Sequence, residues 1–237
     1  MNICNKLCTK DIFASYAGKN VIENINISVG IGEIVSLVGR SGVGKTTLFE
    51  ILAGLNLPDS GDVFLNNECV TGQSGKVGYM LQRDLLLPYK TVAQNVALPI
   101  VIRGEKSKTA QQKVLPYFER FGLSGYENSY PYQLSGGMKQ RAALLRAYLF
   151  GGDVMLLDEP FSALDAITRA DMRGWFSDLA KNFNLTALLI THDIEEAVIL
   201  SDRVYVMSGL PGQIAAEIKL PENRDISEFK ETITQYL

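Results

Sequence analysis

The segment from Gly39 to Thr46 has the residue types and spacing of a phosphate-binding loop. It reads Gly39-Arg40-Ser41-Gly42-Val43-Gly44-Lys45-Thr46 and matches the pattern G-x-x-x-x-G-K-[ST] at every fixed position. The glycines let backbone N–H groups turn toward a ligand, and the N-terminus of the following helix adds positive potential. In such a loop Lys45 would contact β- and γ-phosphates, and the Thr46 hydroxyl would bind Mg²⁺. The segment therefore predicts a nucleotide site.

Two adjacent carboxylates follow an apolar run later in the chain. Val154 to Leu157 leads directly into Asp158 and Glu159. Ligands of open α/β sheets bind beyond the carboxyl ends of the strands, and successive side chains of a strand point in different directions. We therefore expect Asp158 to face Mg²⁺ and Glu159 to polarise the attacking water. The structural alternative is a helix-capping acid followed by a solvated one.

A third segment, Ser135-Gly136-Gly137, begins a predicted helix with two glycines. Serine is a good N-cap residue, but glycine lowers the stability of a helix. That cost is understandable if bare N–H groups and the Ser135 hydroxyl must approach a phosphate closely. Taken alone, the segment favours the simpler interpretation of a capped helix start without a ligand.

Three further polar or aromatic residues occupy informative positions. His192, the only histidine, comes shortly after the apolar run Leu185 to Ile190 and falls at the sheet edge predicted for the two carboxylates. Gln82 follows the run Val77 to Leu81 in the same way, so it could contact the γ-phosphate or the metal. Tyr16 precedes the glycine loop and either stacks on a base or packs on neighbouring strands.

Apolar runs of strand length must position these side chains. Four runs are typical of strands buried on both faces of a parallel sheet: Ile34 to Val38, Val77 to Leu81, Val154 to Leu157 and Leu185 to Ile190. The first run leads into the glycine loop, and the helix after the loop should close near Gly54. Its predicted apolar face consists of Leu48, Ile51, Leu52 and Leu55. Strand, loop and helix occur in the order that phosphate binding requires, which predicts an α/β core.

A helical segment, roughly Arg83 to Gly152, interrupts this core. Thr91 with Gln94 forms a capping box, and Ala110 to Phe121 has helical periodicity that ends at Gly122. We interpret this segment as a helical insertion between the second and third strands of the core.

Short strands are expected at both ends of the chain. Ile25, Ile27 and Val29 alternate with polar neighbours, as in a half-buried strand. Near the other end, Val204 to Met207 and Gln213 to Ile218 are two short strands joined by a turn that contains Gly209, Pro211 and Gly212.

The composition of the 237 residues excludes several classes of protein. The 23 Lys and Arg against 26 Asp and Glu give a net charge of −3, which argues against a nucleic-acid partner. The longest stretch without charge, Val204 to Ala216, is too short to span a bilayer, and no apolar leader is visible at the start. The three cysteines have no zinc-site spacing, so reduced thiols are expected. A secreted, membrane-spanning or disulfide-built protein is therefore not expected.

Taken together, these segments resemble the nucleotide-binding subunit of ATP-binding cassette (ABC) transporters over almost the whole chain. The segment Leu134 to Arg141, LSGGMKQR, is similar to the signature that separates this family from other P-loop NTPases. The other motifs occur in the family's order: Tyr16, Gly39 to Thr46, Gln82, Leu134 to Gln140, Val154 to Glu159, Ala163-Leu164-Asp165 and His192.

The resemblance implies an α/β P-loop NTPase fold. It consists of a RecA-like core, an N-terminal antiparallel β-subdomain and a helical subdomain insertion. The whole chain, 1–237, would be one nucleotide-binding domain, with 1–82 and 153–237 as the core with its β-subdomain and about 83–152 as the helical subdomain.

The resemblance also implies the roles of individual residues. Glu159 would be the catalytic base, His192 would contact the γ-phosphate, and Lys45 would complete the catalytic set. Mg²⁺ would be held by Thr46, Gln82 and Asp158. The contacts to ATP would be made by Tyr16, Gly39, Arg40, Ser41, Gly42, Val43, Gly44, Lys45, Thr46, Thr47, Gln82, Ser135, Gly136 and Gly137.

Partners and location follow from the same resemblance. ATP would lie between the glycine loop of one copy and Ser135 to Gly137 of a second copy or a homologous cassette, and Ser162 to Asp165 would link the two sites. The function implied is ATP hydrolysis coupled to transport, as a translocase subunit on the cytoplasmic face of the cell membrane. Transmembrane permease subunits would be direct partners, and an extracytoplasmic solute-binding protein would be an indirect one.

Further segments are similar to importers of the nitrate, sulfonate, taurine and bicarbonate group, and to thiamine- and pyrimidine-precursor importers. They are Gln82 to Pro88, Asn95 to Pro99 and Tyr130 to Gln133. Tyr89, Arg83 and Leu145-Arg146-Ala147 depart from that pattern.

Two alternative functions are a soluble ABC-type ATPase of DNA repair or translation, and a module that binds ATP without turnover. The chain has no long coiled-coil insertion or second cassette, and intact Glu159 and His192 argue against the non-hydrolysing module.

An apolar run, Leu85 to Tyr89, follows Gln82 directly. It either forms an exposed patch for a partner or packs inward. The resemblance places it beside the groove that receives a short permease helix, so we expect Leu86 and Tyr89 to be exposed there. The alternative is that Leu85 to Leu87 fill the core of the helical insertion.

Overall fold

The computed structural model describes residues 5–151, 154–221 and 223–237. Within these residues, six strands form a central sheet in the order β11-β10-β4-β9-β8-β7. Five of them run parallel, and only β11 is antiparallel to its neighbour β10. Their bounds are β4 (Ile34–Gly39), β7 (Gly78–Met80), β8 (Met155–Asp158), β9 (Ala187–Thr191), β10 (Arg203–Ser208) and β11 (Gln213–Lys219). The predicted parallel core and the two terminal strands are confirmed.

Burial along the central strands follows their position in the sheet. All residues of β4, β8 and β9 are buried, as predicted for strands covered on both faces. The prediction for Val77 to Leu81 was wrong at its end: β7 stops at Met80, and the Leu81 side chain is 43% exposed. Because β7 is the edge strand of the sheet, the chain can leave it early without breaking pairs on both sides.

A second, antiparallel sheet is built from the first part of the chain. Its long central strand β1 (Asn5–Tyr16) pairs with β2 (Lys19–Ile25), β3 (Ser28–Gly30) and β5 (Ser60–Leu65), and β6 (Glu68–Cys69) pairs with β5. The prediction of one strand through Ile25, Ile27 and Val29 was wrong. Thr9 separates β2 from β3, because its hydroxyl donates to the Ile25 carbonyl (3.0 Å) and accepts from the Ile27 N–H (2.9 Å). The three apolar side chains are nevertheless buried.

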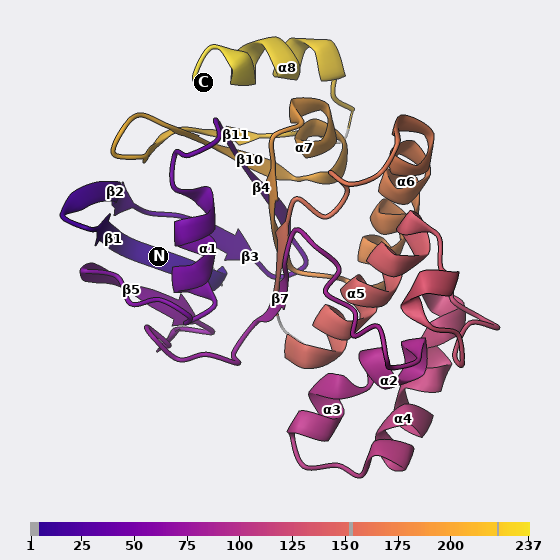
Figure 1. Cartoon of the computed structure of the whole chain (residues 1–237). Helices are drawn as coiled ribbons and strands as arrows, with labels where there is room; N and C mark the ends of the chain where they lie inside the picture. Colours follow the sequence, from indigo (N-terminus) through magenta and orange to yellow (C-terminus); the bar gives the residue numbers. More distant parts are fainter. Residues whose placement is uncertain (1–4, 152–153, 222) are drawn as a thin grey trace.

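Helix α1 (Lys45–Leu52) lies between the two sheets (Figure 1). Leu48, Phe49, Ile51 and Leu52 are buried in one cluster with residues of both sheets. The helix closes at Gly54, which has a φ of 69°, as predicted. Leu55 is not part of the buried face: it lies beyond the helix and is 58% exposed.

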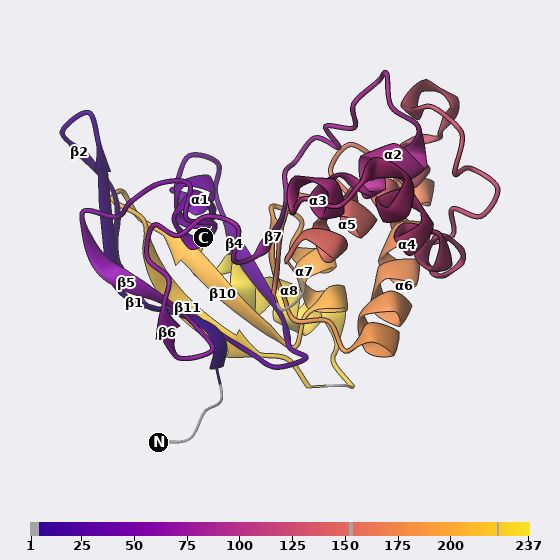
Figure 2. The ribbon, with the colours of Figure 1, turned by 90° about the horizontal axis from the view of Figure 1, so that it is seen from below.

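The middle of the chain supplies a group of helices on the side of the central sheet away from β1, β2 and β5 (Figures 1 and 2). They are α2 (Val92–Val96), α3 (Leu98–Ile102), α4 (Ser107–Arg120), a 3-10 turn (Pro131–Gln133) and α5 (Gly136–Gly151). The capping box is confirmed, since Thr91 and Gln94 exchange side-chain-to-backbone hydrogen bonds of 3.0 and 3.3 Å. Helix α4 ends before Gly122 as predicted, but begins at Ser107. Gly152 lies outside the described residues.

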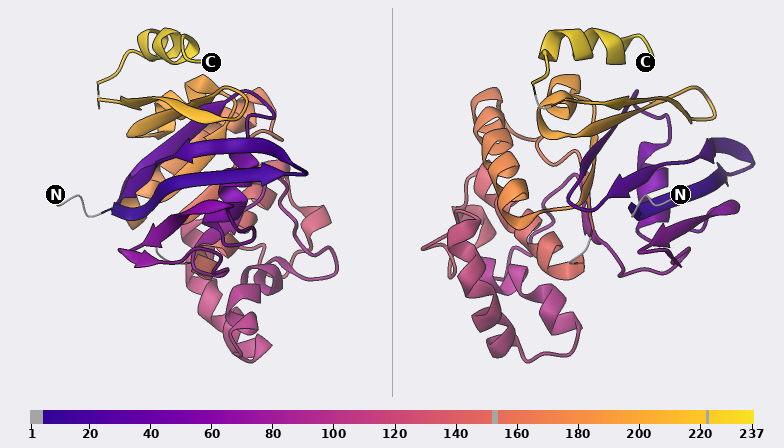
Figure 3. Two further views of the ribbon diagram at one scale, coloured as in Figure 1. Left: turned by 90° about the vertical axis from the view of Figure 1, so that its left-hand side faces the viewer. Right: turned by 180° about the vertical axis from the view of Figure 1, so that it is seen from behind.

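Three more helices lie in the described part of the chain after β8. Helix α6 (Ala166–Phe183) begins at an Asp165 N-cap, and α7 (Ile194–Leu200) begins at an Asp193 N-cap. The last helix, α8 (Ile226–Thr234), lies beside α7 at the β10–β11 end of the molecule (Figure 3). Among the helices of the described residues, none is both long and apolar enough to cross a bilayer.

The segment after β7 is only partly exposed. Tyr89 is 71% exposed and Leu85 52% exposed, but Leu86 is 7% exposed and belongs to the same buried cluster as Val92 and Val96. The expectation that Leu86 is exposed was therefore wrong. Arg146 of α5 explains the inward turn, because its guanidinium donates to the carbonyls of Asp84 (2.5 Å) and Leu85 (2.8 Å).

This difference predicts opposite outcomes for two substitutions by glutamate. Leu86→Glu would place a charge among apolar side chains without a partner, so we expect it to lower the free energy of unfolding by about 3 kcal/mol or more. Tyr89→Glu changes an exposed residue and should alter stability by less than about 1 kcal/mol. Urea unfolding of both variants tests this. Equal midpoints for the two variants would contradict the inward packing of Leu86.

Candidate nucleotide site

A cleft of about 390 Å³ opens at the carboxyl ends of β4, β7, β8 and β9. The cleft is lined by Ser41, Gly42, Lys45, Thr46, Gln82, Asp158, Glu159, Ile190 and His192. All of these except Ile190 were predicted from the sequence to bind nucleotide or metal or to take part in hydrolysis. These residues are far apart in sequence, and parallel strands bring them together because their carboxyl ends meet at one edge. Ile190 was missed, since an apolar residue inside a strand run carries no chemical signal of its own.

Backbone geometry explains two glycines of the loop between β4 and α1. Gly42 has a φ of 82°, and a Cβ added there would meet no atom within 4 Å, so the space above this residue is open to a ligand. Gly44 has a φ of 106°, and a Cβ there would lie 2.4 Å from Ile22 Cγ2. Left-handed backbone favours glycine at both positions. The loop can therefore turn its N–H groups toward the cleft while it packs closely against β2.

Lys45 is held inside this loop. Its ammonium donates to the carbonyls of Gly39 (2.6 Å) and Arg40 (2.9 Å), and the residue is 8% exposed. Burial lowers the pKa of Lys45, while the charges of Glu159 and Asp158 raise it. The ammonium is therefore held by carbonyls of its own loop, and it supplies positive charge in the cleft that the two carboxylates also line.

Asp158 is the buried carboxylate of the cleft. Burial, followed by the neighbouring charge of Glu159, raises its pKa to about 6, although Lys45 acts in the opposite direction. The negative charge of the two carboxylates is therefore not fully compensated by Lys45, and a bound cation would stabilise it. The Thr46 hydroxyl, the Gln82 amide oxygen and the Asp158 carboxylate are all oxygen donors, which Mg²⁺ prefers. The residues present fit a magnesium ion, and its chemistry there would be to neutralise charge on phosphate oxygens.

Glu159 is held between two side chains from neighbouring strand ends. Its carboxylate lies 3.1 Å from His192 Nδ1 and accepts a 3.1 Å hydrogen bond from Gln82 Nε2. Its own N–H donates to the Ile190 carbonyl at 2.9 Å, which extends the pairing of β8 with β9 by one residue. Glu159 has a φ of 46°, a left-handed conformation that is uncommon for this residue type. The Glu159 carboxylate lines the cleft together with Asp158.

The other predicted contacts do not line this cleft. Ser135 caps α5 by accepting a hydrogen bond from the Met138 N–H at 3.3 Å, and Ser135 and Gly136 are exposed. Tyr16 lies at the end of β1 and is 81% exposed, so it is not packed on neighbouring strands. Among the remaining loop residues Val43 is buried, and Arg40 is exposed. Eight of the seventeen predicted site residues therefore line the cleft of one copy of the chain, and the other nine do not.

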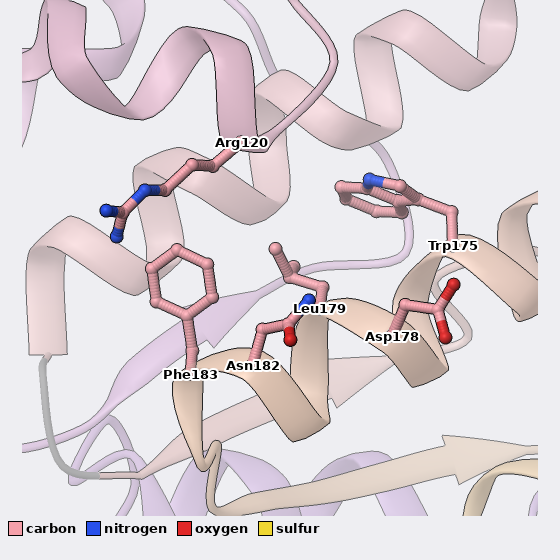
Figure 4. A pocket seen from close by; sticks show the side chains of 6 residues that line it. All are labelled: Arg120, Trp175, Asp178, Leu179, Asn182 and Phe183. Carbon is pink, nitrogen blue, oxygen red and sulfur yellow. The ribbon is translucent and has the colours of Figure 1, made fainter.

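A second pocket of about 400 Å³ lies between α4 and α6 (Figure 4). Its lining consists of Arg120, Trp175, Asp178, Leu179, Asn182 and Phe183. The Arg120 guanidinium lies 5.5 Å from the centre of the Phe183 ring. The pocket contains none of the predicted nucleotide contacts.

Helix α7, which starts just after His192, carries a buried carboxyl group. Glu196 is 3% exposed, and one of its oxygens has no hydrogen-bond partner. Burial and the charge of Asp193 raise its pKa to about 7, against the opposite effects of a hydrogen bond from Thr191 and of the charges of Arg173 and Arg169. The folded protein therefore binds a proton at Glu196 more tightly than the unfolded chain does.

This shift predicts a loss of stability with rising pH. The contribution of Glu196 is fully present below its ordinary pKa of 4.5 and disappears as the pH rises through about 7. Glu196→Gln removes the titration, so relative to the wild type it should gain about 2 kcal/mol of unfolding free energy between pH 5 and pH 8. Urea unfolding across this range measures the difference, with Glu195→Gln as a control on the same helix. Parallel pH profiles of wild type and Glu196→Gln would contradict the prediction.

Comparison with known proteins identifies this set of motifs. Residues 22–162, which include the glycine loop, the signature helix and both carboxylates, match the protein family described as "ABC transporter". The chain belongs to the ABC transporter family. The resemblance stated from the sequence and the α/β fold class are confirmed, and this ABC protein is an ATP-binding, ATP-hydrolysing subunit.

Similar curated proteins are named as import ATP-binding proteins. The formylaminopyrimidine import ATP-binding protein ThiZ of Halalkalibacterium halodurans is 44% identical over 88% of this chain and 82% of its own length. The aliphatic sulfonates import ATP-binding protein SsuB of Bacillus thuringiensis is 39% identical over 92% and 87%. The taurine import ATP-binding protein TauB of Yersinia pestis is 37% identical over 88% and 82%. These names do not favour the alternative of a soluble ATPase in DNA repair or translation.

Solved structures agree with the fold. The ATP-binding cassette MJ0796, in a dimeric post-hydrolysis state with ADP and Pi, is 27% identical, with a TM-score of 0.75 over 91% of this chain and 99% of that one. CbiO1 from Clostridium perfringens, part of an ABC transporter complex, has a TM-score of 0.82 over 98% and 91% at 23% identity. The latter likeness shows the fold alone.

Proposed function

We propose that this ABC ATPase powers the import of a small solute, and that the cleft at the end of the parallel strands is its hydrolytic site. One observation carries the proposal. Glu159 is held by His192 and Gln82 at 3.1 Å each, beside Lys45 and the glycine loop. A base, a group that orients it and phosphate-binding groups therefore face one space of about 390 Å³.

Each residue has a distinct part in the proposed reaction. Glu159 orients the attacking water and accepts its proton, and His192 and Gln82 keep the carboxylate turned toward the cleft. Lys45 and the loop N–H groups bind the phosphates of ATP. Thr46, Gln82 and Asp158 would hold Mg²⁺, which neutralises the charge that develops on the phosphate oxygens. Tyr16 is exposed where its ring is free to stack on the base.

The proposed site is completed by a second copy or a homologous cassette. Ser135, Gly136 and Gly137 lie at the start of α5 and do not line the cleft of their own chain. We propose that they contact the phosphates of ATP bound to the other cassette, where bare N–H groups at a helix N-terminus favour an anion. The dimeric state of the cassette MJ0796 supports this pairing.

The proposed partners are transmembrane permease subunits and, indirectly, an extracytoplasmic solute-binding protein. The names of ThiZ, SsuB and TauB favour a formylaminopyrimidine-like, sulfonate or taurine-like solute. The proposed location is the cytoplasmic face of the membrane, where the chain would contact the permease. The exposed Tyr89 and Leu85 are the proposed permease contacts. They belong to the segment of about 83–152 that we propose as a helical subdomain, beside a core of 1–82 and 153–237.

Uptake by the assembled transporter tests this function. The chain would be co-expressed with candidate permease and binding-protein subunits chosen from its neighbouring genes, and the complex would be reconstituted in liposomes loaded with MgATP. We expect ATP-dependent uptake of one of three probes: formylaminopyrimidine, taurine or an alkanesulfonate. ATP hydrolysis without uptake of any probe would contradict the solute class, and an absence of hydrolysis would contradict the proposed site.

A further inference from the structure

The segment Phe161–Asp165 connects the end of β8 to the start of α6, and it touches two parts of the proposed site. On one side, the Ser162 hydroxyl and N–H donate to the Glu159 carbonyl at 2.9 and 3.2 Å. On the other side, it packs against the signature glycines: a Cβ added at Gly136 would lie 3.2 Å from Leu164 Cδ2. A displacement of this segment would therefore reach both Glu159 and the start of α5.

Arg169, in the first turns of α6, holds this segment. Its guanidinium donates to the carbonyl of Phe161 through Nε (3.3 Å) and to the carbonyl of Leu164 through Nη2 (2.8 Å). The third nitrogen, Nη1, lies 4.0 Å from Asp193 Oδ2. Asp193 follows His192 and caps α7 by accepting from the Glu196 N–H at 3.2 Å. One side chain therefore joins the segment after Glu159 to the residue after His192.

The position of Arg169 is electrostatically unfavourable for the helix itself. Helix α6 begins at Ala166, so Arg169 lies one turn from the positive end of the helix dipole, where a cation is destabilising. The planar fork of the guanidinium compensates by reaching two carbonyls and a carboxylate at once, a geometry that an ammonium group does not have. The contacts of its side chain therefore explain why position 169 is an arginine, whereas the helix dipole alone would disfavour a cation there.

We propose that Arg169 is a positioning residue for ATP hydrolysis: it holds Phe161–Asp165 and Asp193 together, and so keeps Glu159 and His192 in contact across the cleft. The inference rests on the proposed roles of Glu159 and His192. Arg169 does not line the cleft and does not touch the nucleotide site directly. Its loss should therefore lower turnover while leaving the binding of MgATP to one chain intact.

Arg173, one turn further along α6, provides a matched control. It also faces α7, where its Nη1 lies 3.7 Å from Glu195 Oε1. Its described contacts do not include the segment from Glu159 to Asp165. Arg173→Gln therefore removes a cation between the same two helices without releasing that segment.

The chain contains two single-residue probes for this test. His192 is the only histidine, so its imidazole gives one set of NMR signals from the edge of the cleft. Trp175, the only tryptophan, lies on α6 beside the pocket shared with Arg120 and Phe183 (Figure 4), and its fluorescence reports whether α6 is folded. The variants are Arg169→Ala, Arg169→Lys and Arg173→Gln, each compared with the wild-type chain.

For Arg169→Ala we expect a wild-type Trp175 emission, shifted His192 signals, a kcat lowered about tenfold or more, and an affinity for MgATP within about twofold of wild type. Arg169→Lys should recover part of the kcat, and Arg173→Gln should leave the His192 signals unchanged. A folded Arg169→Ala chain with unchanged His192 signals and kcat would overturn the inference. If Arg169→Ala does not fold, unchanged His192 signals and kcat in Arg169→Lys would overturn it. If the His192 signals shift in Arg169→Ala but the wild-type chain itself hydrolyses no ATP, the proposed function would be contradicted and the positioning role of Arg169 would not.

Discussion

Glu159→Gln is expected to abolish most ATP turnover while ATP still binds. Glutamine has nearly the same shape and can still contact His192 and Gln82, the two partners found at 3.1 Å. It cannot accept a proton from water, so the variant loses stabilisation of the transition state only. We expect kcat to fall about 100-fold or more and the dissociation constant for MgATP to change by less than about threefold.

Steady-state hydrolysis and equilibrium binding of a fluorescent ATP analogue measure the two quantities. Glu195→Gln, the same change on a partly exposed carboxylate of α7, is the control and should hydrolyse at the wild-type rate. Lys45→Ala supplies the contrast, since its ammonium contacts ground-state phosphates and its loss should weaken binding itself. Turnover near the wild-type rate in Glu159→Gln would exclude Glu159 as the base.

Ser135→Arg is expected to prevent the ATP-dependent pairing of two chains. Ser135 is exposed at the start of α5 and does not line the cleft of its own chain. A bulky cation there would keep the helix N-terminus away from the phosphates bound to the other chain, whereas the cleft of the same chain keeps its nucleotide contacts. In the Glu159→Gln background with ATP, size exclusion should give a dimer, and addition of Ser135→Arg should give a monomer.

The loss of the Ser135 cap should by itself cost only about 1 kcal/mol of stability. Ser124→Arg, the same change at an exposed serine after α4, is the matched control and should leave the dimer intact. Wild-type hydrolysis by Ser135→Arg, at a specific rate independent of protein concentration, would show that one chain hydrolyses ATP alone.

The local patterns that depend on near neighbours were predictable from the sequence. The glycine loop, the Thr91 capping box and the end of α4 at Gly122 were all found where the sequence places them. Each depends on backbone conformation or on hydrogen bonds within a few residues, so the amino-acid types carry the information directly. Buried strands such as β4 and β9 were equally clear because burial on both faces requires a continuous apolar run.

Predictions failed where distant residues compete for the same backbone or surface. The hydroxyl of Thr9, sixteen residues from Ile25, bonds to the Ile25 carbonyl and the Ile27 N–H, two backbone groups that a continuous strand would use to pair with its neighbour. Arg146 holds the carbonyls of Asp84 and Leu85, which turns Leu86 into the core although the sequence reads as an exposed apolar patch. No pattern of neighbouring residues contains these contacts.

The sequence by itself determined which residues could do the chemistry and the kind of fold that holds them, because the phosphate loop and the strand-end acids are local signals. Only the tertiary structure decided how they meet. The left-handed turn at Glu159 points its carboxylate at His192 and Gln82, and Arg169 joins the segments that carry Glu159 and His192. These contacts join residues up to 77 positions apart, as in the hydrogen bond from Gln82 to Glu159. Their geometry depends on the packing of parallel strand ends, which no single segment of the chain specifies.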